Sequence, residues 1–372
     1  MEVVHLNDLN LIRKKKNLDK VIIHAKNFKY SSLISYAIKF ALWSLKDDGV
    51  LLIKNSNQNY VGRLVPNSYD FKLLIHKTAS VLKDFGFQFS INKKEQEIEI
   101  VKQHIPFDND WSLGIMFSGS INDYKMLVES INVYKDLKIK SDSKLEILVC
   151  GPASEREKFK DFDIRYIDYD EKNINPMRGK DNSRFLINQK KNHLIKQMLY
   201  SNCCVLHSRI TLDKECLYNM PDHFDVIVPR IFYKHNNTFI PDNDLVFYKW
   251  NNTHEYVISA PNFRDYDRNN YLSHLKNRIP SVEGACLITK KDIFINNMLD
   301  GEIAWDEAED VEWMKRIYQA NKIFEISLYS KAFSSTTKMS KAALSMPTPI
   351  RFLLRRIYYY LKIIKSSILN HA

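Results

Sequence analysis

Short apolar runs alternate with segments of helical periodicity in this chain. An apolar run at 19–25 is followed by a 3.6-residue period over 31–45, and the same order repeats with 50–55 and 71–84. Apolar runs of this length are typical of buried strands, and the helical period indicates helices that pack on them. Because strands separated by helices favour parallel pairing, the alternation predicts an α/β fold.

A strict apolar–polar alternation over 87–101 predicts two antiparallel strands, which would close a small α/β domain over 1–105. A basic, polar stretch separates this domain from a second region, in which an apolar strand begins at Trp111. Ligands of parallel α/β sheets bind at the carboxyl ends of the strands, so the residues after each strand are site candidates. In the second region we expect a helix at 122–137 and strands at 145–151 and 163–169.

The composition indicates which kinds of partner the chain could bind and which cellular compartment suits it. A net charge of +11 indicates anionic partners such as nucleic acid, an acidic membrane surface or a phosphorylated substrate. The five cysteines show no C-x-x-C spacing, which suits reduced thiols in the cytosol and argues against a zinc finger. The first twenty residues lack the apolar core of a signal peptide, and no run of 18 apolar residues predicts a membrane-spanning helix.

Two segments of the first domain, LKDDGVLLI at 45–53 and LKDFGFQF at 82–89, carry a glycine just before an apolar run. With the surrounding order of strand, helix, strand, helix and hairpin, they resemble the C-terminal half of a Rossmann-type methyltransferase. The Gly-rich first turn that would hold the methyl donor is absent. We therefore interpret 1–105 as a degenerate, non-catalytic remnant or a docking domain.

Four segments of the second region occur in a set order. They are FSGS at 117–120, NQKKNHLI at 188–195, VLHSRI at 205–210 and WDEAEDVEW at 305–313. In this order they resemble the glycosyltransferase A-type fold, of the broad family 2 kind. The resemblance implies a Rossmann-like, nucleotide-sugar-binding domain over 108–340 and an enzyme of the hexosyltransferase kind. Such an enzyme would move a sugar from a nucleotide-sugar donor to a glycan or lipid-linked acceptor, in bacterial surface-polysaccharide synthesis.

The donor's pyrophosphate gains negative charge as the sugar bond breaks, and a cationic group must stabilise it. Family members usually bind a divalent metal there through an Asp-x-Asp triplet, and the matching position here reads His207-Ser208-Arg209. A guanidinium forms paired hydrogen bonds with phosphate oxygens, so Arg209 is predicted to replace the metal. The alternatives are a Mn or Mg ion held by His207 with Asp213 or another carboxylate, and a plain solvated strand end.

The resemblance implies further donor-binding residues. Lys191 and Asn192 match a basic-plus-Asn pair that contacts the nucleotide, and Ser118-Gly119-Ser120 match the place of the uracil or ribose. The alternatives are a solvated helix face that also includes Lys190 and Lys196, and a simple small-residue turn.

An acceptor hydroxyl has a pKa far above 7, so a carboxylate must take its proton during attack. The pair Glu309-Asp310 resembles the family's acidic signature at a helix start, which makes Asp310 the candidate general base and Glu309 the alternative. Gly284, which lacks a Cβ, and Trp305, whose ring can stack on a sugar, are predicted to contact the acceptor. Acidic residues also favour helix starts and glycines favour turns without any catalytic role, so those interpretations stay open.

The last segment, 347–372, begins with a pair of prolines and mixes basic with apolar and aromatic residues. As a helix it would be amphipathic and would suit an anionic membrane surface. A terminal helix docked on its own domain or on a partner subunit is the alternative. The sequence therefore indicates a cytoplasmic protein, peripheral on the inner face of a membrane.

Two other functions compete with sugar transfer. The missing Asp-x-Asp triplet would suit a non-catalytic scaffold of a polysaccharide assembly. The net charge and the methyltransferase-like region would suit a nucleic-acid-binding protein. Because the charge is spread along the chain and no aromatic–basic RNA motif is present, nucleic acid is not an expected partner.

Overall fold

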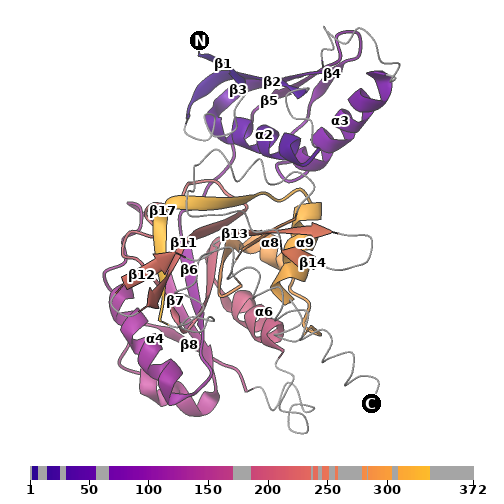
Figure 1. The fold of residues 1–372 in the computed structure, drawn as a ribbon. Helices are drawn as coiled ribbons and strands as arrows, with labels where there is room; N and C mark the ends of the chain where they lie inside the picture. Colours follow the sequence, from indigo (N-terminus) through magenta and orange to yellow (C-terminus); the bar gives the residue numbers. More distant parts are fainter. Residues whose placement is uncertain are drawn as a thin grey trace, which may run out of the picture.

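A five-stranded sheet, a nine-stranded sheet and a three-stranded sheet organise the chain (Figure 1). The structure is a computed structural model. In the part that it describes, no helix is long and apolar enough to span a bilayer. Trp305 and the segment 347–372 lie outside the described residues. The described residues are 2–6, 15–25, 31–55, 67–170, 186–235, 238–241, 245–250, 256–258, 279–282, 284–303 and 309–335.

The five-stranded sheet has the order β1-β2-β3-β5-β4. Its first three strands are parallel, and β5 runs antiparallel to both β3 and β4. The strands and helices expected here are found within a few residues of their predicted positions, while the likeness to methyltransferases stays a prediction. The elements are β1 (Val3–Leu6), β2 (Leu18–His24), α2 (Ser31–Ser44), β3 (Leu45–Lys54), α3 (Asn67–Leu82), β4 (Ser90–Asn92) and β5 (Glu97–Val101).

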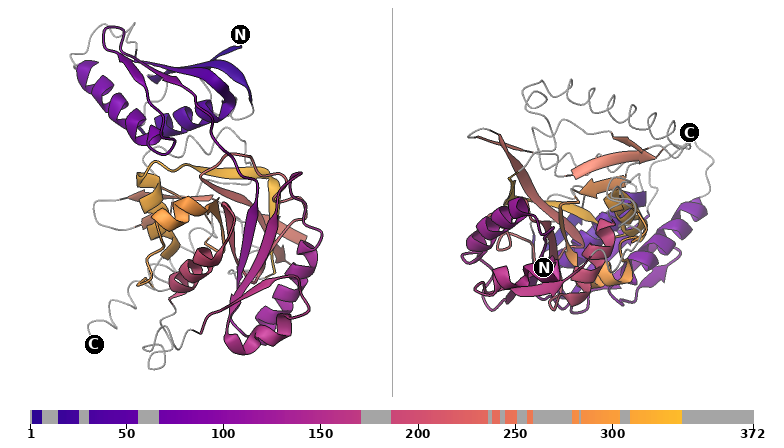
Figure 2. Two further views of the ribbon diagram at one scale, coloured as in Figure 1. Left: turned by 180° about the vertical axis from the view of Figure 1, so that it is seen from behind. Right: turned by 90° about the horizontal axis from the view of Figure 1, so that it is seen from below.

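Helix α2 is enclosed on all sides, because every residue from 34 to 42 is buried. A helix that is apolar all round belongs between two layers, and α2 lies between the small sheet and the larger one (Figures 1 and 2). Lys39, near the middle of this helix, has a side chain that is 0% exposed. A charge that is buried so completely needs close partners.

Four parallel strands form one half of the nine-stranded sheet, in the order β9-β6-β7-β8. Met116 pairs with Cys150 on one side and with His207 on the other, so the carboxyl ends of these strands meet at one edge. The predicted α/β fold with parallel strands is confirmed. The elements are β6 (Trp111–Met116), α4 (Ile121–Tyr134), β7 (Leu145–Gly151), β8 (Arg165–Asp168), α6 (Ile187–Gln197) and β9 (Asn202–His207), with a 3₁₀-helix η2 (Ala153–Phe159).

The other half of this sheet continues from β9 in the order β16-β11-β17-β10, with β12 paired to β11. β16 is antiparallel to β9 and β11, whereas β11 and β17 are parallel. The three-stranded sheet has the order β14-β13-β15. The elements are β10 (Ile210–Leu212), β11 (Val226–His235), β12 (Thr238–Pro241), β13 (Leu245–Trp250), β14 (Tyr256–Ile258), β15 (Ile279–Val282), β16 (Cys286–Lys290), α8 (Lys291–Asn296), α9 (Glu309–Gln319) and β17 (Phe324–Ser334).

Gly114 explains how α6 comes to lie on β6. A Cβ at this position would be 2.9 Å from Cδ2 of Leu194 and would also clash with Met198, both at the end of α6. Because glycine has no Cβ, helix and strand pack closely here. This contact fixes α6 against the strand whose carboxyl end borders the candidate site.

Candidate functional site

The four sequence segments meet at the carboxyl edge of the parallel strands. Lys190 on α6 donates to the carbonyl of Phe117, the first residue after β6, at 2.6 Å. The end of β9 lies beside the end of β6, since His207 pairs with Met116. Segments that are about ninety residues apart in the chain, Phe117 and His207, therefore border one region.

The end of β9 is also joined to the start of α9. The backbone N–H of His207 donates to the carbonyl of Ala285 at 3.0 Å. A Cβ on the neighbouring Gly284 would lie 2.9 Å from both Cβ and Cγ of Asp310 and would overlap its carboxylate. Gly284 therefore makes room for the Asp310 side chain, a role that differs from the predicted approach of a sugar to its backbone.

Helix α6 holds the acidic start of α9. Lys191 Nζ lies 3.7 Å from Oε1 of Glu309, and the two side chains are only 0% and 7% exposed. The amide of Asn188 donates to the carbonyls of Asp300 at 3.0 Å and Glu309 at 3.4 Å. Glu309 is thus held inside the protein by an ion pair, whereas Asp310 is partly exposed.

Asn192 makes a pair of backbone hydrogen bonds. Its side chain donates to the carbonyl of Leu299 at 2.7 Å and accepts from the N–H of the same residue at 3.1 Å. These bonds fix the segment that leads toward α9. The structure thereby shows a scaffolding contact for a residue that was predicted to bind the nucleotide, a role that stays a prediction.

The lysines of α6 correct one interpretation of the sequence. Lys190 and Lys191 are buried, so the solvated helix face proposed for them is wrong; Lys196 alone of the three is exposed. Lys190 also lies 5.5 Å from the centre of the Tyr169 ring. Gly114 and Leu194 draw α6 so close to β6 that this side of the helix faces the protein.

The turn after β6 caps a helix. Ser120 is the N-cap of α4, and its hydroxyl accepts from the N–H of Asp123 at 3.2 Å, while the Asp123 carboxylate accepts from the N–H of Ser118 at 3.2 Å. Gly119 between them has φ +86°, which disfavours other residues. These two hydrogen bonds give the small-residue turn a structural role at the edge of the site.

Arg209 lies in the turn between β9 and β10. Its carbonyl accepts from the N–H of Ser335 at 3.0 Å and from its hydroxyl at 3.3 Å, which fixes the backbone at this point. Asp213 follows β10, and its carboxylate accepts from the N–H of Glu215 at 3.1 Å. Across the described ranges, no group of three or more His, Cys, Asp or Glu side chains could hold a metal ion.

Tyr169 is a residue of this edge that the sequence analysis did not single out. It comes just after β8, it is 4% exposed, and its ring centre lies 5.4 Å from that of His193 on α6. Its position as the last residue of a short predicted strand was the signal that could have identified it. Tyr169, His193 and Lys190 together form a polar–aromatic wall beside the ends of β7 and β8.

The cysteines supply no nucleophile at this edge. All five are free and buried. Burial raises the pKa of Cys150, at the end of β7, to about 12, although the charge of Lys190 opposes this shift. A thiol with such a pKa stays protonated at neutral pH and is unreactive.

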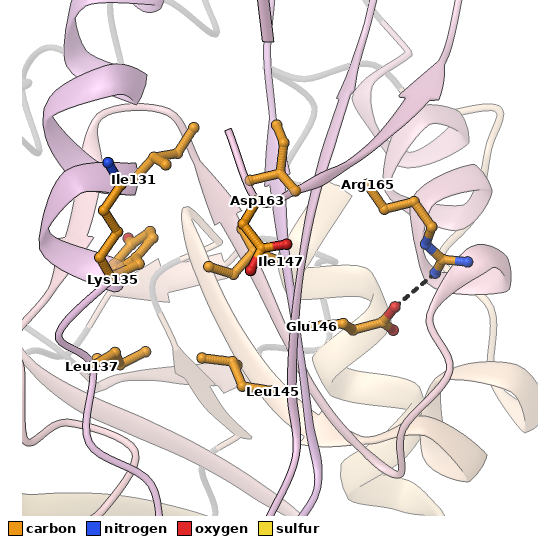
Figure 3. A pocket seen from close by; sticks show the side chains of 10 residues that line it. Ile131, Lys135, Leu137, Leu145, Glu146, Ile147, Asp163 and Arg165 are labelled. Atoms are coloured by element: carbon orange, nitrogen blue, oxygen red, sulfur yellow. Dashed lines mark ion pairs between the residues drawn. The ribbon is translucent and has the colours of Figure 1, made fainter. Parts of the chain in front are cut away.

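A cavity of about 480 Å³ lies at the opposite edge of the sheet, between α4 and the first residues of β7 and β8 (Figure 3). An ion pair of 2.9 Å between Arg165 and Glu146 crosses its wall. Because it lies at the amino ends of the strands, this cavity is separate from the edge where the four segments meet.

No protein-family model and no curated protein sequence matches this chain. Several solved structures are similar to it. S. aureus TarS 1–349 shows 13% identity over 61% of this chain and 60% of that chain, with a TM-score of 0.40. The same protein in complex with UDP-GlcNAc shows 13% identity over 65% and 63%, with a TM-score of 0.39. GalNAc-T7 with UDP, GalNAc and Mn²⁺ shows 11% identity over 76% and 55%, with a TM-score of 0.46. The matched part of this chain thus spans less than two thirds of each of these proteins, and the function proposed below is argued from the residues described above.

Proposed function

We propose that this chain is a glycosyltransferase of the A-type fold, with its nucleotide-sugar-binding domain over 108–340. It moves a sugar from a nucleotide-sugar donor to a glycan or lipid-linked acceptor. One observation carries the proposal: the small-residue turn, two buried lysines, a strand-end arginine and an acidic helix start belong to four distant segments that share one carboxyl edge. That combination supplies a cationic side for a pyrophosphate and an acidic side for an acceptor hydroxyl.

Asp310 is the proposed general base. Glu309 is committed to a buried ion pair with Lys191, so its carboxylate is poorly placed to meet an incoming hydroxyl. Asp310 is partly exposed at the same helix start, and Gly284 leaves space for its carboxylate. The macrodipole at a helix N-terminus also favours the ionised form that a base requires.

Arg209 is the proposed partner of the pyrophosphate. It stands two residues after β9, at the end of the strand beside β6, and its backbone is held by Ser335. A guanidinium there can bind two phosphate oxygens at once. Ser118-Gly119-Ser120, Lys191, Asn192 and His207 complete the proposed donor side, and Trp305 the acceptor side.

The proposed setting is the cytoplasmic face of a bacterial membrane, in surface-polysaccharide synthesis. Two features support it: the net charge of +11, which suits an anionic surface, and five free thiols, which suit a reducing compartment. A non-catalytic scaffold is the second candidate, because the Asp-x-Asp triplet is replaced by His207-Ser208-Arg209.

A transfer assay with a panel of UDP, GDP, CDP and dTDP sugars separates these two candidates. We expect one donor to be turned over by the wild-type chain. Asp310→Asn should lower that rate roughly a hundredfold or more while donor affinity stays nearly unchanged, because a base matters only in the transition state. Glu312→Gln is the matched control: it neutralises an acid on the same helix that is paired with Arg316 at 2.5 Å, and it should retain activity.

Two results would count against the proposal. Donor binding without turnover by the wild-type chain would favour the scaffold. Near-normal turnover by a folded Asp310→Asn variant would move the base to Glu309 or Glu307, or end the assignment.

A further inference from the structure

The buried side of α2 is bonded to the larger sheet through polar groups. Lys39 Nζ lies 2.6 Å from Oδ2 of Asp225, just before β11, and 3.0 Å from Oδ2 of Asp84 in its own unit. The same Asp225 oxygen accepts from the N–H of Ile323, just before β17, at 2.8 Å. One carboxylate thus joins α2 to the beginnings of two neighbouring strands.

Tyr36, one turn earlier on α2, is bonded to the first residue of β17. Its hydroxyl accepts from the N–H of Phe324 at 2.8 Å and donates to the carbonyl of the same residue at 3.1 Å. Both residues are buried, so the hydroxyl satisfies backbone groups of a strand end that is shielded from solvent. Replacing it would leave two backbone groups without that partner.

Asn321 connects the small unit to the end of α9. It lies in the turn after the helix with φ 61°, a left-handed conformation that Asn tolerates better than most residues. Its side chain accepts from the Ser35 hydroxyl at 3.3 Å and donates to the Ser80 hydroxyl at 2.6 Å. The next residue, Lys322, lies 2.7 Å from Asp84. Both helices of the small unit therefore bind the turn that ends α9.

These contacts converge on residues 321–325, directly after the helix that begins with Asp310. We propose that the N-terminal unit is an anchor that holds the C-terminal end of α9 and so positions Asp310 at its other end. Eleven helical residues span about 16 Å, and a rigid helix transmits a displacement of one end to the other. The effect on catalysis rests on the function proposed above; the anchoring itself does not.

The buried face of α2 is not a surface on which the N-terminal unit could dock a separate protein. A docking domain for a separate protein needs an accessible surface, and residues 34–42 are covered by the same chain. Through this face, the unit supports its own chain.

Asn321→Gly tests the anchor. Glycine keeps the positive φ at no steric cost and removes only the bonds to Ser35 and Ser80. Asp142→Gly is the matched control, because Asp142 is an exposed turn residue with φ 65° in the larger unit. Tyr36→Phe is a second variant at the same contact, and it keeps the ring that packs in the core.

Three measurements apply to each purified full-length variant: hydrogen exchange over 309–319, donor affinity, and the catalytic rate. For Asn321→Gly and Tyr36→Phe we expect exchange over α9 to rise about tenfold. We also expect kcat to fall about tenfold with donor affinity unchanged, since small misplacements of a catalytic group are costly. A merely structural lesion would lower the active fraction and donor binding together.

The outcomes separate the anchor from the function. Unchanged exchange and unchanged kcat in both variants of an active enzyme would overturn the anchor and leave the function standing. Faster exchange with an unchanged kcat would overturn the positioning of Asp310. Faster exchange in a chain that turns over no donor would uphold the anchor and overturn the function.

Discussion

Buried lysines occur in two regions of this molecule, and their surroundings differ. At the contact between the units, Lys39 lies 2.6 and 3.0 Å from two carboxylates. At the carboxyl edge, Lys190 contacts a carbonyl and an aromatic ring, and Lys191 lies 3.7 Å from Glu309. The first region is built from short ion pairs between a lysine and two carboxylates. In the second, one lysine forms a longer ion pair and the other is bonded to a backbone carbonyl.

We expect the first region to stabilise the fold and propose that the second binds the donor. Burial disfavours the charged form of Lys39, but the charges of Asp225 and Asp84 outweigh it and raise the pKa of this lysine. A lysine held in this way stays protonated and immobile. At the carboxyl edge, by contrast, a gain or loss of charge should change function more than stability.

The largest expected effect is on stability, in the first region. Lys39→Met would remove the cation that Asp225 and Asp84 share. Because the Asp225 carboxylate would then be buried without that charge, the free energy of unfolding should fall by about 3–5 kcal/mol. Lys46→Met is the control, because Lys46 pairs with Asp19 at 2.5 Å but is 52% exposed; its loss should cost less than about 1 kcal/mol. Urea unfolding followed by circular dichroism gives both values. Equal losses would show that the buried ion pairs of Lys39 contribute no more to stability than an exposed pair does.

The next effect concerns charge in the second region. Arg209→Ala should weaken donor binding and lower the rate by about ten- to a hundredfold, the usual cost of losing charge-assisted hydrogen bonds. Arg209→Lys should also be poor, because lysine lacks the planar fork. Activity should survive EDTA if the guanidinium neutralises the pyrophosphate.

Loss of activity in EDTA, with recovery on adding manganese, would contradict this account of Arg209. The metal would then be sought at His207, with Asp213 or another carboxylate beside it.

A smaller effect is expected at Gly284. The Cβ of Gly284→Ala would force the Asp310 side chain out of its position, and we expect kcat to fall about tenfold with little change in donor affinity. Gly301→Ala serves as a control, because its Cβ would meet the flexible Gln189 side chain at 3.0 Å. Equal activity of the two variants would show that Gly284 is an ordinary turn glycine.

The smallest effect is a pH dependence at Lys290. Burial lowers the pKa of this lysine to about 8, and its ammonium donates to Asn202 at 2.6 Å. Between that value and the unfolded value of 10.5, the unfolded chain binds more protons, so stability should rise with pH by about 1 kcal/mol between pH 7.5 and 9. Lys290→Met should remove this slope in urea titrations across that range. A slope that persists in the variant would assign it to another group.

The parallel half of the fold could be predicted from the sequence, because strands and helices of 145–169 and 121–134 carry their own local periodicity. The meeting of Phe117 and His207 at one edge followed from the rule for strand ends, whereas Asp310 was placed there only by the resemblance to a known family. The antiparallel half could not be predicted in the same way. The neighbours of β17 depend on contacts with β10 and β11 that no local pattern encodes.

The contact between the two units was harder to predict from the sequence, although one feature of the sequence indicated it. The run SSLISYAIKFALWSL is apolar on every face, which indicates a helix buried all round, and it carries a single charge at Lys39. The partners of that charge, Asp84 and Asp225, lie far away in the sequence, so only the folded chain identifies them. The burial of Lys190 and Lys191 was missed for a similar reason, since it depends on the close approach at Gly114.

The distance along the chain between Tyr36 and Phe324 has a consequence for biosynthesis. These bonded residues are 288 positions apart. Helix α2 therefore leaves the ribosome long before β17, which covers it in the finished fold, has been synthesised. At about 5–20 residues per second, the wait is roughly 15–60 s. During that interval the apolar face of α2, with Lys39 in it, is exposed on the nascent chain. Chaperones bind exposed apolar surfaces of this kind. Yield in the cell should therefore depend on translation speed and on chaperone supply more than the stability of the finished fold would suggest.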